Sequence, residues 1–241
     1  MVFLLGKLSW PEVAEILEKT DFVIIPVGSL EQHGRHLPLD NDTHTAFEVS
    51  VRLAKHLEGR LNILVAPPIP YGVSGHHMDF PGTVTIGSET LTKIIVEVCL
   101  SLHKHGFKRF LILNGHGGNT CALRLAVRKL VLEHGVEAYA VNWWETVKDV
   151  VTEIYGVPIT HADEGETAVA YALNQRVVAE EARGSGTYGK KTQVYTVKPM
   201  KEYTSTGSLG HPEKATKKHG EKIVSIAVER LAQELIKITG K

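Results

Sequence analysis

Residues 21–28 read DFVIIPVG, and this stretch decides the fold class. Its apolar residues run without alternation over the length of one strand. Such a run is typical of a strand covered on both faces, as in a parallel sheet packed between helices. A helical pattern from Pro11 to Leu17 precedes it, and an irregular polar segment follows at once. The stretch therefore predicts a central strand of an α/β sheet.

Helix-like and strand-like segments continue to alternate along the chain. Strand-like segments occupy residues 61–67, 107–115 and 136–143, and helix-like segments occupy residues 43–57, 88–106 and 119–135. Strands separated by helices form βαβ units, which pair in parallel and carry helices on both faces. Gly106 and Gly135 stand where helix C-terminal caps belong, and Asn119 with Thr120 could cap the helix over residues 119–135. We predict a three-layer αβα fold with a mostly parallel central sheet.

The chain has 241 residues, of which 43% are hydrophobic, so we expect one α/β domain over residues 1–241. Two long segments, residues 67–87 and 182–210, interrupt the alternation. Loops of that length inside a compact domain usually carry function. Within the second, TQVYTV at 192–197 alternates like a strand between glycine-rich flanks, which indicates a hairpin or an oligomerisation arm. Residues 212–239 are predicted to close the chain as a helix.

Charge and cysteine content argue against several kinds of partner. Lys plus Arg and Asp plus Glu both total 27, without a basic stripe, so nucleic acid is not an expected partner. Cys99 and Cys121 lie in apolar segments and are expected to be buried thiols in a reducing compartment. No apolar run reaches the roughly 18 to 20 residues of a spanning helix, and no basic leader precedes the first apolar patch. We expect a cytoplasmic protein without a membrane partner.

Side chains able to bind metals follow two of the predicted strands. In GSLEQHGRHLPLDNDTH, residues 28–44, Glu31 and His33 stand two apart and can project to one side, and Asp42 follows. His116 comes after the strand-like FLILNG, inside NGHGGN, where glycines let a metal or a substrate approach the backbone. Ligand sites of parallel sheets lie beyond the carboxyl ends of the strands, so these side chains should converge.

A further polar cluster stands in THADEGET, residues 160–167. It places His161, Asp163 and Glu166 at the start of a predicted helix, which Thr160 or Asp163 could cap. Capping therefore explains part of this cluster without a functional role.

Imidazole and carboxylate ligands suit Zn²⁺, Mn²⁺ or Fe²⁺, and an aspartate can bridge two ions about 3.5 to 4 Å apart. Glu31, His33, Asp42 and His116 could together supply two such divalent ions. A purely structural role would leave buried charges uncompensated, which is costly.

These motifs resemble the blocks of the creatininase (creatinine amidohydrolase) family. The matching blocks, in family order, are GSLEQHGRHLPLDND, YGVSGHHMDFPGTVTI, LNGHGGN, HADEGET and TGSLGHPEKAT. The resemblance spans roughly residues 8–235, and the pattern E-x-H-G-x-H-L-P-L-x-x-D followed by N-G-H-G-G-N is far more specific than one short motif. It implies the creatininase-like fold and a dinuclear metal centre. Glu31 and His116 would hold one ion, His33 the other, and Asp42 would be shared.

The sequence departs from creatininase proper at two places. Gly117 and Gly118 stand where that enzyme has a Tyr-Glu pair, whose glutamate holds the second ion. Glu166 is then predicted to be a replacement ligand or a substrate anchor. GVPITH lacks the Trp-Asp pair that contacts substrate in creatininase, which argues against creatinine as the substrate.

The resemblance implies hydrolysis of a non-peptide C–N bond in a small cyclic amide or formamide by a metal-activated hydroxide. The departing nitrogen needs a proton from a nearby residue with a pKa near 7 that is not a ligand. His161 is the predicted donor and His36 the alternative. The residues predicted to bind the substrate or line its pocket are Ser74, His76, Gly117 and Trp144.

Three other functions fit parts of the pattern. The formamide deformylases of flavin and deazaflavin biosynthesis resemble this chain in NGHGGN, whereas HMDFPGT is more typical of the wider family. A non-enzymatic small-molecule binding protein would hold its ion in a site closed by four protein ligands. A metallophosphoesterase would need more basic residues near the site than Arg35. The resemblance also implies a homo-oligomer, since family members form hexamers or other multimers.

Overall fold

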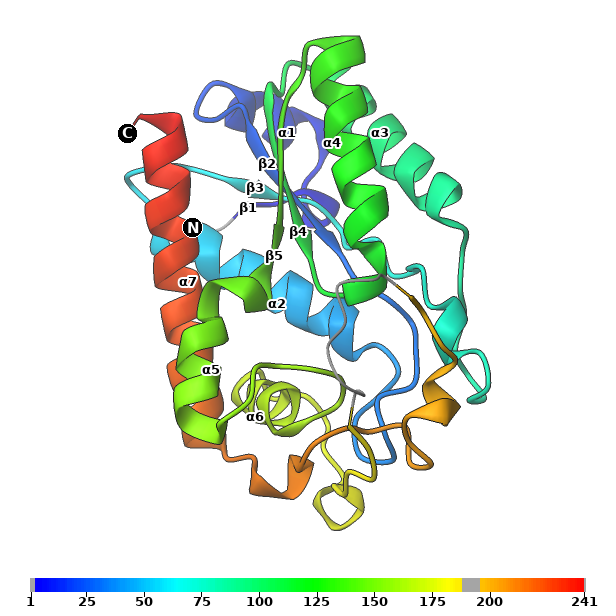
Figure 1. Cartoon of the computed structure of the whole chain (residues 1–241). Helices are drawn as coiled ribbons and strands as arrows, with labels where there is room; N and C mark the ends of the chain where they lie inside the picture. The colour runs from blue at the N-terminus through cyan, green and yellow to red at the C-terminus, as the bar shows by residue number, and fades with distance from the viewer. Residues whose placement is uncertain (1–2, 188–195, 241) are drawn as a thin grey trace.

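The computed structural model describes residues 3–187 and 196–240 and contains a parallel sheet in the order β1-β3-β2-β4-β5 (Figure 1). The apolar stretch at residues 21–28 contains its central strand, and all six residues of that strand are buried. The strands are β1 (Phe3–Leu4), β2 (Phe22–Val27), β3 (Leu64–Val65), β4 (Arg109–Asn114) and β5 (Glu137–Asn142). β2 and β4 pair along their whole length, with Val27 opposite Asn114 at their carboxyl ends.

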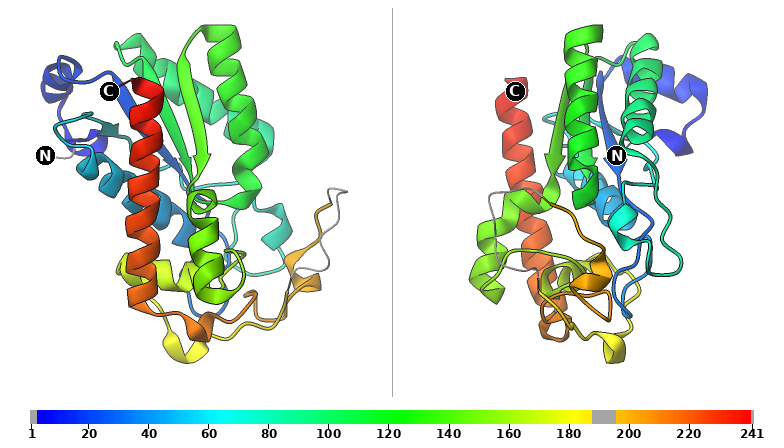
Figure 2. Two further views of the ribbon diagram at one scale, coloured as in Figure 1. Left: turned by 60° about the vertical axis from the view of Figure 1, so that its left-hand side comes forward. Right: turned by 45° about the vertical axis from the view of Figure 1, so that its right-hand side comes forward.

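Helices cover both faces of this sheet, which confirms the predicted αβα layers (Figure 2). The α-helices are α1 (Trp10–Leu17), α2 (Asn41–His56), α3 (Ser88–Lys104), α4 (Thr120–His134), α5 (Lys148–Tyr155), α6 (Glu164–Ala172) and α7 (Lys217–Thr239). Alternate residues of β2 point to opposite faces: Phe22 and Ile24 pack with α2 and α7, and Val23 and Ile25 pack with α3 and α4. Both faces are apolar because both are covered.

Two details of the helices differ from the sequence-based expectations. Cys121 is exposed rather than buried, because the buried positions of α4 are Ala122, Leu123, Ala126 and Leu130, and Cys121 lies on another side of the helix. Asn119 precedes α4 but its side chain does not cap it. Instead its amide donates to Gly28 O (2.9 Å) and accepts from Val73 N (2.8 Å), so it joins two loops.

The two long segments lie at the carboxyl end of the sheet, the lower end in Figure 1. Residues 66–87 contain a 3-10 turn, Gly75–His77. Of the second segment, residues 188–195 lie outside the described part, so the hairpin or oligomerisation arm predicted over 182–210 is untested there. Its described flanks run side by side, since Gly210 N donates to Gly186 O at 3.0 Å.

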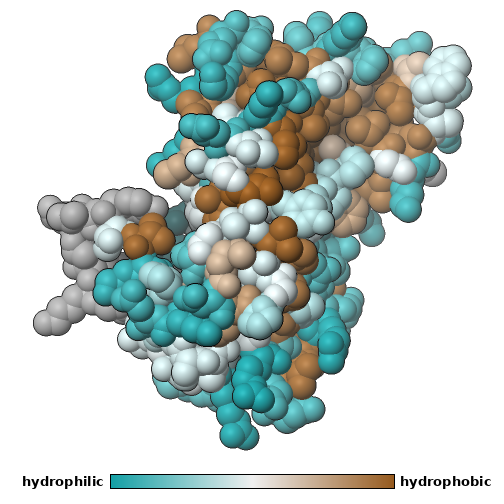
Figure 3. All heavy atoms as spheres, turned by 90° about the vertical axis from the view of Figure 1, so that its right-hand side faces the viewer, coloured by the Kyte–Doolittle hydropathy of each residue, from teal (hydrophilic) through white to brown (hydrophobic). Residues whose placement is uncertain are grey.

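The face that carries α3 and α4 exposes apolar side chains (Figure 3). On α4, Leu132 is 71% exposed and Leu125 is 44% exposed. The predicted homo-oligomer stays a prediction.

Among the described residues, no helix combines the length and apolar character that a membrane span requires.

Candidate functional site

The loop after β2 carries the first candidate ligands across the carboxyl end of the sheet. Glu31 N donates to Leu39 O at 2.9 Å, and His33 bridges to Leu37, so the loop folds back on itself. α2 then begins with Asp42 in its first turn. Gly115 lets the loop after β4 approach closely, because a Cβ there would lie 2.3 Å from Asp42 O. The parallel pairing of β2 with β4 thus brings two distant motifs to one place.

One group of donor atoms consists of Glu31, Asp42 and His116, whose ligand atoms lie within 4.8 Å of one another. His116 Nδ1 lies 3.1 Å from Glu31 Oε1 and 3.2 Å from Asp42 Oδ2. All three residues are at most 5% exposed. The atoms are close enough to bind one cation, whose charge would offset the repulsion between the two carboxylates.

The second group consists of His33, His161 and Glu166. His33 Nε2 lies 2.9 Å from Asp42 Oδ1 and 3.7 Å from Glu166 Oε2. Asp42 therefore presents one oxygen to each group. α6, whose N-terminus Asp163 caps by accepting from Gly165 N and Glu166 N, delivers Glu166. Asp163 caps the helix as expected, whereas Glu166 faces the other donors.

The hydrogen bonds of the imidazoles fit metal binding. His33 Nδ1 lies 3.1 Å from Glu31 O, and His116 Nε2 lies 3.1 Å from Val73 O. A ring N–H that donates to a backbone carbonyl leaves the other nitrogen free for a cation, the usual arrangement around metal-bound histidines. Glu31 Oε1 and Asp42 Oδ2 are buried and receive no hydrogen bond from the described residues. A bound cation would satisfy buried carboxylate oxygens that lack a hydrogen-bond donor.

The pKa values of these groups show that the buried carboxylates stabilise positive charge on the neighbouring imidazoles. Burial would lower the pKa of His33, but Asp42 and Glu166 outweigh it and raise that pKa to about 10. Burial would also lower the pKa of His116, but Glu31 and Asp42 outweigh it and raise that pKa well above its usual range. Burial would raise the pKa of Glu31, but His116 holds it well below the ordinary value. Without a cation, protons on the imidazoles balance the carboxylates.

Glu166 differs from the other carboxylates. Burial, opposed in part by His33, raises the pKa of Glu166 to about 8. Its Oε2 accepts from Ala162 N at 2.6 Å, which holds the side chain toward the second group. A cation beside it would favour its ionised form.

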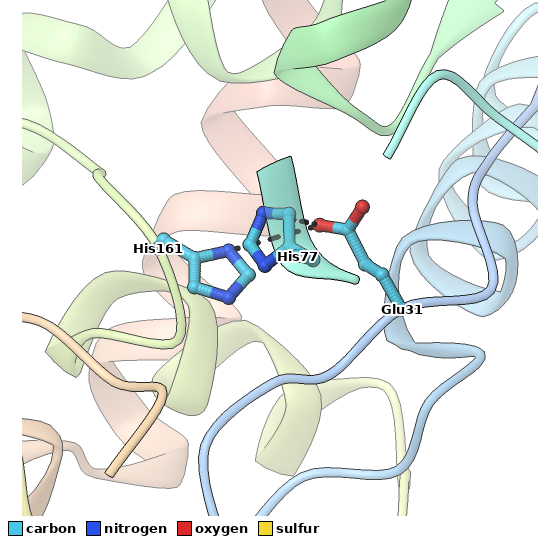
Figure 4. A group of neighbouring side chains, drawn as sticks. All are labelled: Glu31, His77 and His161. Atoms are coloured by element: carbon cyan, nitrogen blue, oxygen red, sulfur yellow. Dashed lines mark ion pairs between the residues drawn. The ribbon is translucent and has the colours of Figure 1, made fainter. Parts of the chain in front are cut away.

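A third set of donor atoms, Glu31, His77 and His161, lies next to the first two (Figure 4). His77 comes from the 3-10 turn of the 66–87 loop, and His161 from the loop before α6. Glu31 Oε1 lies 3.4 Å from His77 Nε2 and 3.8 Å from His161 Nδ1. In Figure 4 both imidazole rings lie on the same side of the Glu31 carboxylate, with His77 drawn between His161 and Glu31.

A cavity of about 610 Å³ opens onto these side chains. Among the residues that the sequence predicts for the site, those lining it are Glu31, Asp42, His76, His116, Gly117, Trp144, His161 and Glu166. His76 stacks on His116 with ring centroids 5.7 Å apart. Further walls come from the segment 196–203, which contributes Val197, Lys198, Met200 and Tyr203. The described loops therefore build a pocket around the donor atoms.

Besides the candidate ligand His33, two predicted site residues lie outside the cavity lining. Ser74 is fully buried, and its hydroxyl lies 2.5 Å from that of Ser29, which donates to Glu31 Oε2 at 2.9 Å. His36 is also buried and bonds Thr167 Oγ1 at 2.8 Å. Burial, together with the charge of His33, lowers the pKa of His36 to about 4. Both residues stand behind the ligands, and their predicted contacts with substrate or its protons stay predictions.

Two residues of the site, Gln32 and Ser29, are absent from the sequence-based predictions. Gln32 stands between Glu31 and His33 in an extended segment, so alternation predicts that it points away, yet its amide lies 2.8 Å from His77 Nδ1 and 2.9 Å from His161 Nε2. Ser29 orients Glu31. No spacing signal marks either residue, because both act through partners that are distant in sequence.

Similarity to known proteins agrees with this arrangement. The chain is 33% identical to the mycofactocin precursor peptide peptidase of Mycobacterium ulcerans, over 98% of this chain and 92% of the relative. It is 30% identical to the creatinine amidohydrolase of Pseudomonas putida, over 95% of each chain. It is 27% identical to a 2-amino-5-formylamino-6-ribosylaminopyrimidin-4(3H)-one 5'-monophosphate deformylase of Methanococcus maripaludis, over 90% of this chain and 83% of the relative.

A solved structure of the manganese form of creatininase superposes with a TM-score of 0.82, at 26% identity over 98% of each chain. Residues 6–235 match the family described as creatininase, creatinine amidohydrolase. These findings confirm the predicted family, fold and hydrolase activity, and they remove the support for a non-enzymatic binding protein. The chain belongs to the creatininase family of amidohydrolases, which contains hydrolases of non-peptide C–N bonds.

Proposed function

We propose that this chain is a metal-dependent amidohydrolase that cleaves a non-peptide C–N bond in a small cyclic amide or formamide. The observation that carries the proposal is the division of Asp42 between two donor groups. Its Oδ1 faces His33 at 2.9 Å, and its Oδ2 faces His116 at 3.2 Å. A carboxylate shared in this way would be a ligand of both ions in a dinuclear centre.

The residues that would hold the ions follow from the two groups. Glu31, Asp42 and His116 would hold the first ion. His33 and Glu166 of the second group would hold the second ion together with Asp42, which leaves His161 for proton transfer. Bound there, divalent cations would lower the pKa of water toward neutrality and polarise an amide carbonyl. Imidazole with carboxylate suits Zn²⁺, Mn²⁺ or Fe²⁺.

His161 is placed to relay the proton. Its Nε2 lies 3.0 Å from Gln32 O, which leaves Nδ1 as the nitrogen that faces the centre. Nδ1 can accept a proton from the attacking water while the C–O bond forms, and return it to the nitrogen when the C–N bond breaks. His36 bonds Thr167 behind the ligands, which favours His161 over it.

The cavity supports a small substrate. Its volume of about 610 Å³ falls within the roughly 300 to 1,000 Å³ of small-molecule sites. Its wall residues Val73, Trp144, Ile159 and Met200 present apolar surface, and a Cβ at Gly117 would meet no atom within 4 Å, so this glycine leaves open space. An amide with an apolar or ring-shaped body matches this lining.

A phosphate-bearing formamide, as in the name of the M. maripaludis relative, is the alternative. Lys198 is the one cationic side chain other than histidine among the described residues of the lining, and Glu202 lies 3.0 Å from it. A phosphate site usually uses several unpaired cationic side chains. The single, paired lysine among the described side chains of the lining therefore favours the uncharged amide.

The proposal is tested by removing metals with a chelator, restoring Zn²⁺, Mn²⁺ or Fe²⁺ separately, and assaying three substrate sets. The sets are formamides with and without phosphate, cyclic amides including creatinine, and short peptides. We expect hydrolysis of a formamide or cyclic amide only after a metal is restored. Equal rates without metal would contradict the metal mechanism. Activity confined to the peptides would show that the substrate class is that of the mycobacterial relative's name.

A further inference from the structure

Gln32 lies between the two histidines that face Glu31 from the cavity side. Its Nε2 is 2.8 Å from His77 Nδ1, 2.9 Å from His161 Nε2 and 3.0 Å from Gly207 O. Gln32 is 4% exposed, His77 1% and His161 6%, so these side chains are shielded from bulk water. Each hydrogen of the network must therefore have an acceptor within it.

Two backbone groups fix the orientation of the Gln32 amide independently of the histidines. Gly34 N donates to Oε1 at 3.0 Å, and Nε2 donates to Gly207 O at 3.0 Å. The reversed amide would set its NH₂ against the Gly34 N–H and its oxygen against the Gly207 carbonyl. Gly207 has a φ of 86°, and a Cβ there would lie 1.9 Å from Gln32 Oε1, so the close approach depends on glycine.

The fixed amide determines which ring nitrogens carry protons. His161 Nε2 also lies 3.0 Å from Gln32 O, which can only accept, so Nε2 carries the proton and donates. One hydrogen of the Gln32 amide goes to Gly207 O, and the other then has His77 Nδ1 as its acceptor. A proton on His77 Nδ1 would face that N–H directly. His77 is consequently neutral, with its proton on Nε2.

We propose that Gln32 is a positioning residue that holds His77 and His161 in the same Nε2–H tautomer, while the two rings turn opposite nitrogens toward Glu31. His161 then presents a lone pair at Nδ1, 3.8 Å from Glu31 Oε1, and His77 presents an N–H at Nε2, 3.4 Å from the same oxygen. A neutral imidazole binds a cation only through its unprotonated nitrogen. Glu31, His77 and His161 thus do not form a third metal site, although their donor atoms lie within 4.8 Å.

Because the two rings turn opposite nitrogens toward Glu31, they have different tasks, and this step rests on the proposed function. His161 Nδ1 is ready to accept the proton of the attacking water. His77 lines the cavity, so its Nε2–H can donate to the substrate oxygen on which negative charge develops. A neutral imidazole is an effective hydrogen-bond donor of this kind because it need not release its proton.

The direct test is ¹⁵N NMR of histidine-labelled protein, metal-free and loaded with Zn²⁺, with signals assigned by their loss in His77→Gln and His161→Gln. We expect the Nε2–H tautomer for both rings in both samples, with His161 Nδ1 unprotonated. The Nδ1–H tautomer or a doubly protonated ring at His77 would overturn the proposal. This measurement needs no activity, so it can fail or succeed independently of the proposed function.

The second test uses Gln32→Glu, whose carboxylate accepts rather than donates. We expect it to move the His77 proton to Nδ1, and Gln32→Leu to leave the ring as a mixture of tautomers. An unchanged His77 spectrum in Gln32→Glu would show that Gln32 does not set the tautomer.

The third test separates donation from metal binding at His77. We expect His77→Ala to keep the metal content of the parent and to lower kcat by about 10²-fold with little change in KM, and His77→Gln, which keeps an N–H, to recover part of the loss. His116→Ala is the comparison that should lose metal. Loss of a metal equivalent in His77→Ala would show that the ring is a ligand.

Discussion

The two halves of the candidate metal centre are built from different parts of the fold. Glu31, Asp42 and His116 follow two paired central strands and are at most 5% exposed. His33 shares their loop, but its partners His161 and Glu166 come from the turn into α6. The Glu166 side chain is 14% exposed and lies 3.7 Å from His33, whereas contacts in the first half are 3.1 to 3.2 Å.

This difference reflects how each half is held. The register of β2 and β4 fixes the first half, because hydrogen bonds along both strands set where each loop begins. The second half depends on α6, which packs on α7, and on Ala162, a non-glycine residue with a φ of 45° between His161 and Asp163. A residue other than glycine keeps a left-handed backbone conformation only where the surrounding structure imposes it. We expect the first half to bind its cation more tightly than the second.

Asp42→Ala should have the largest effect, since it removes a ligand from both halves. We expect metal content near zero after dialysis and a fall in metal affinity of more than about 100-fold, because loss of an outer-shell partner alone costs about 10- to 100-fold. Metal analysis with calorimetric titration measures both. Asp40→Ala, at an exposed aspartate whose Oδ1 accepts from Gln175, is the matched control and should match the parent. Full metal content in Asp42→Ala would exclude the shared site.

Glu31→Gln and Glu166→Gln separate the two halves while keeping side-chain shape. Glu31→Gln should abolish binding at the tighter site, and Glu166→Gln should weaken only the second by about 10- to 100-fold. Titration should then show one retained tight site in Glu166→Gln. Equal losses in both variants would mean that the halves do not differ as proposed.

Stability of the metal-free protein should depend on pH in the direction that the raised pKa values set. The pKa of His33 is raised from 6.5 to about 10 and that of Glu166 from 4.5 to about 8, and His116 is raised as well. Groups with a raised folded pKa stabilise the fold at low pH and lose that contribution as pH rises through the folded value. The melting temperature without metal should therefore fall between about pH 7 and pH 10.

Metal-loaded protein provides the contrast for that measurement. Cations replace the imidazole protons, so binding should release protons and the melting temperature should change less over the same range. A metal-free protein whose melting temperature rises above pH 7 would contradict the assignment of these protons.

Ser74→Ala should have the smallest effect and tests the predicted substrate contact. Ser74 reaches Glu31 through Ser29, so we expect a destabilisation of about 1 kcal/mol and a modest loss of metal affinity at the first half, with KM unchanged. Steady-state kinetics and thermal melts distinguish the outcomes. A raised KM with unchanged metal affinity would instead support the contact that the family resemblance implies.

Most of the fold was predictable because burial imposes local patterns. The continuous apolar run of β2 requires cover on both faces, and the positions of α2, α3 and α4 follow from the apolar spacing between strands. Cys121 was misplaced because an apolar segment does not reveal which residues of a helix face the sheet. Asn119 was misplaced because a polar residue at a helix start can bond a neighbouring loop instead of the helix.

The sequence by itself indicated the family through its motif blocks, the αβα layers, and the candidate donors Glu31, His33, Asp42 and His116, which stand beyond buried strands. Only the tertiary structure decided that Glu166 faces His33, that Ser74 and His36 lie behind the ligands, and that Gln32 joins His77 to His161. The physical reason is range. Spacing and periodicity act within one element, whereas a hydrogen bond such as that from Gln32 to Gly207 depends on loops brought together by the packing of the whole chain.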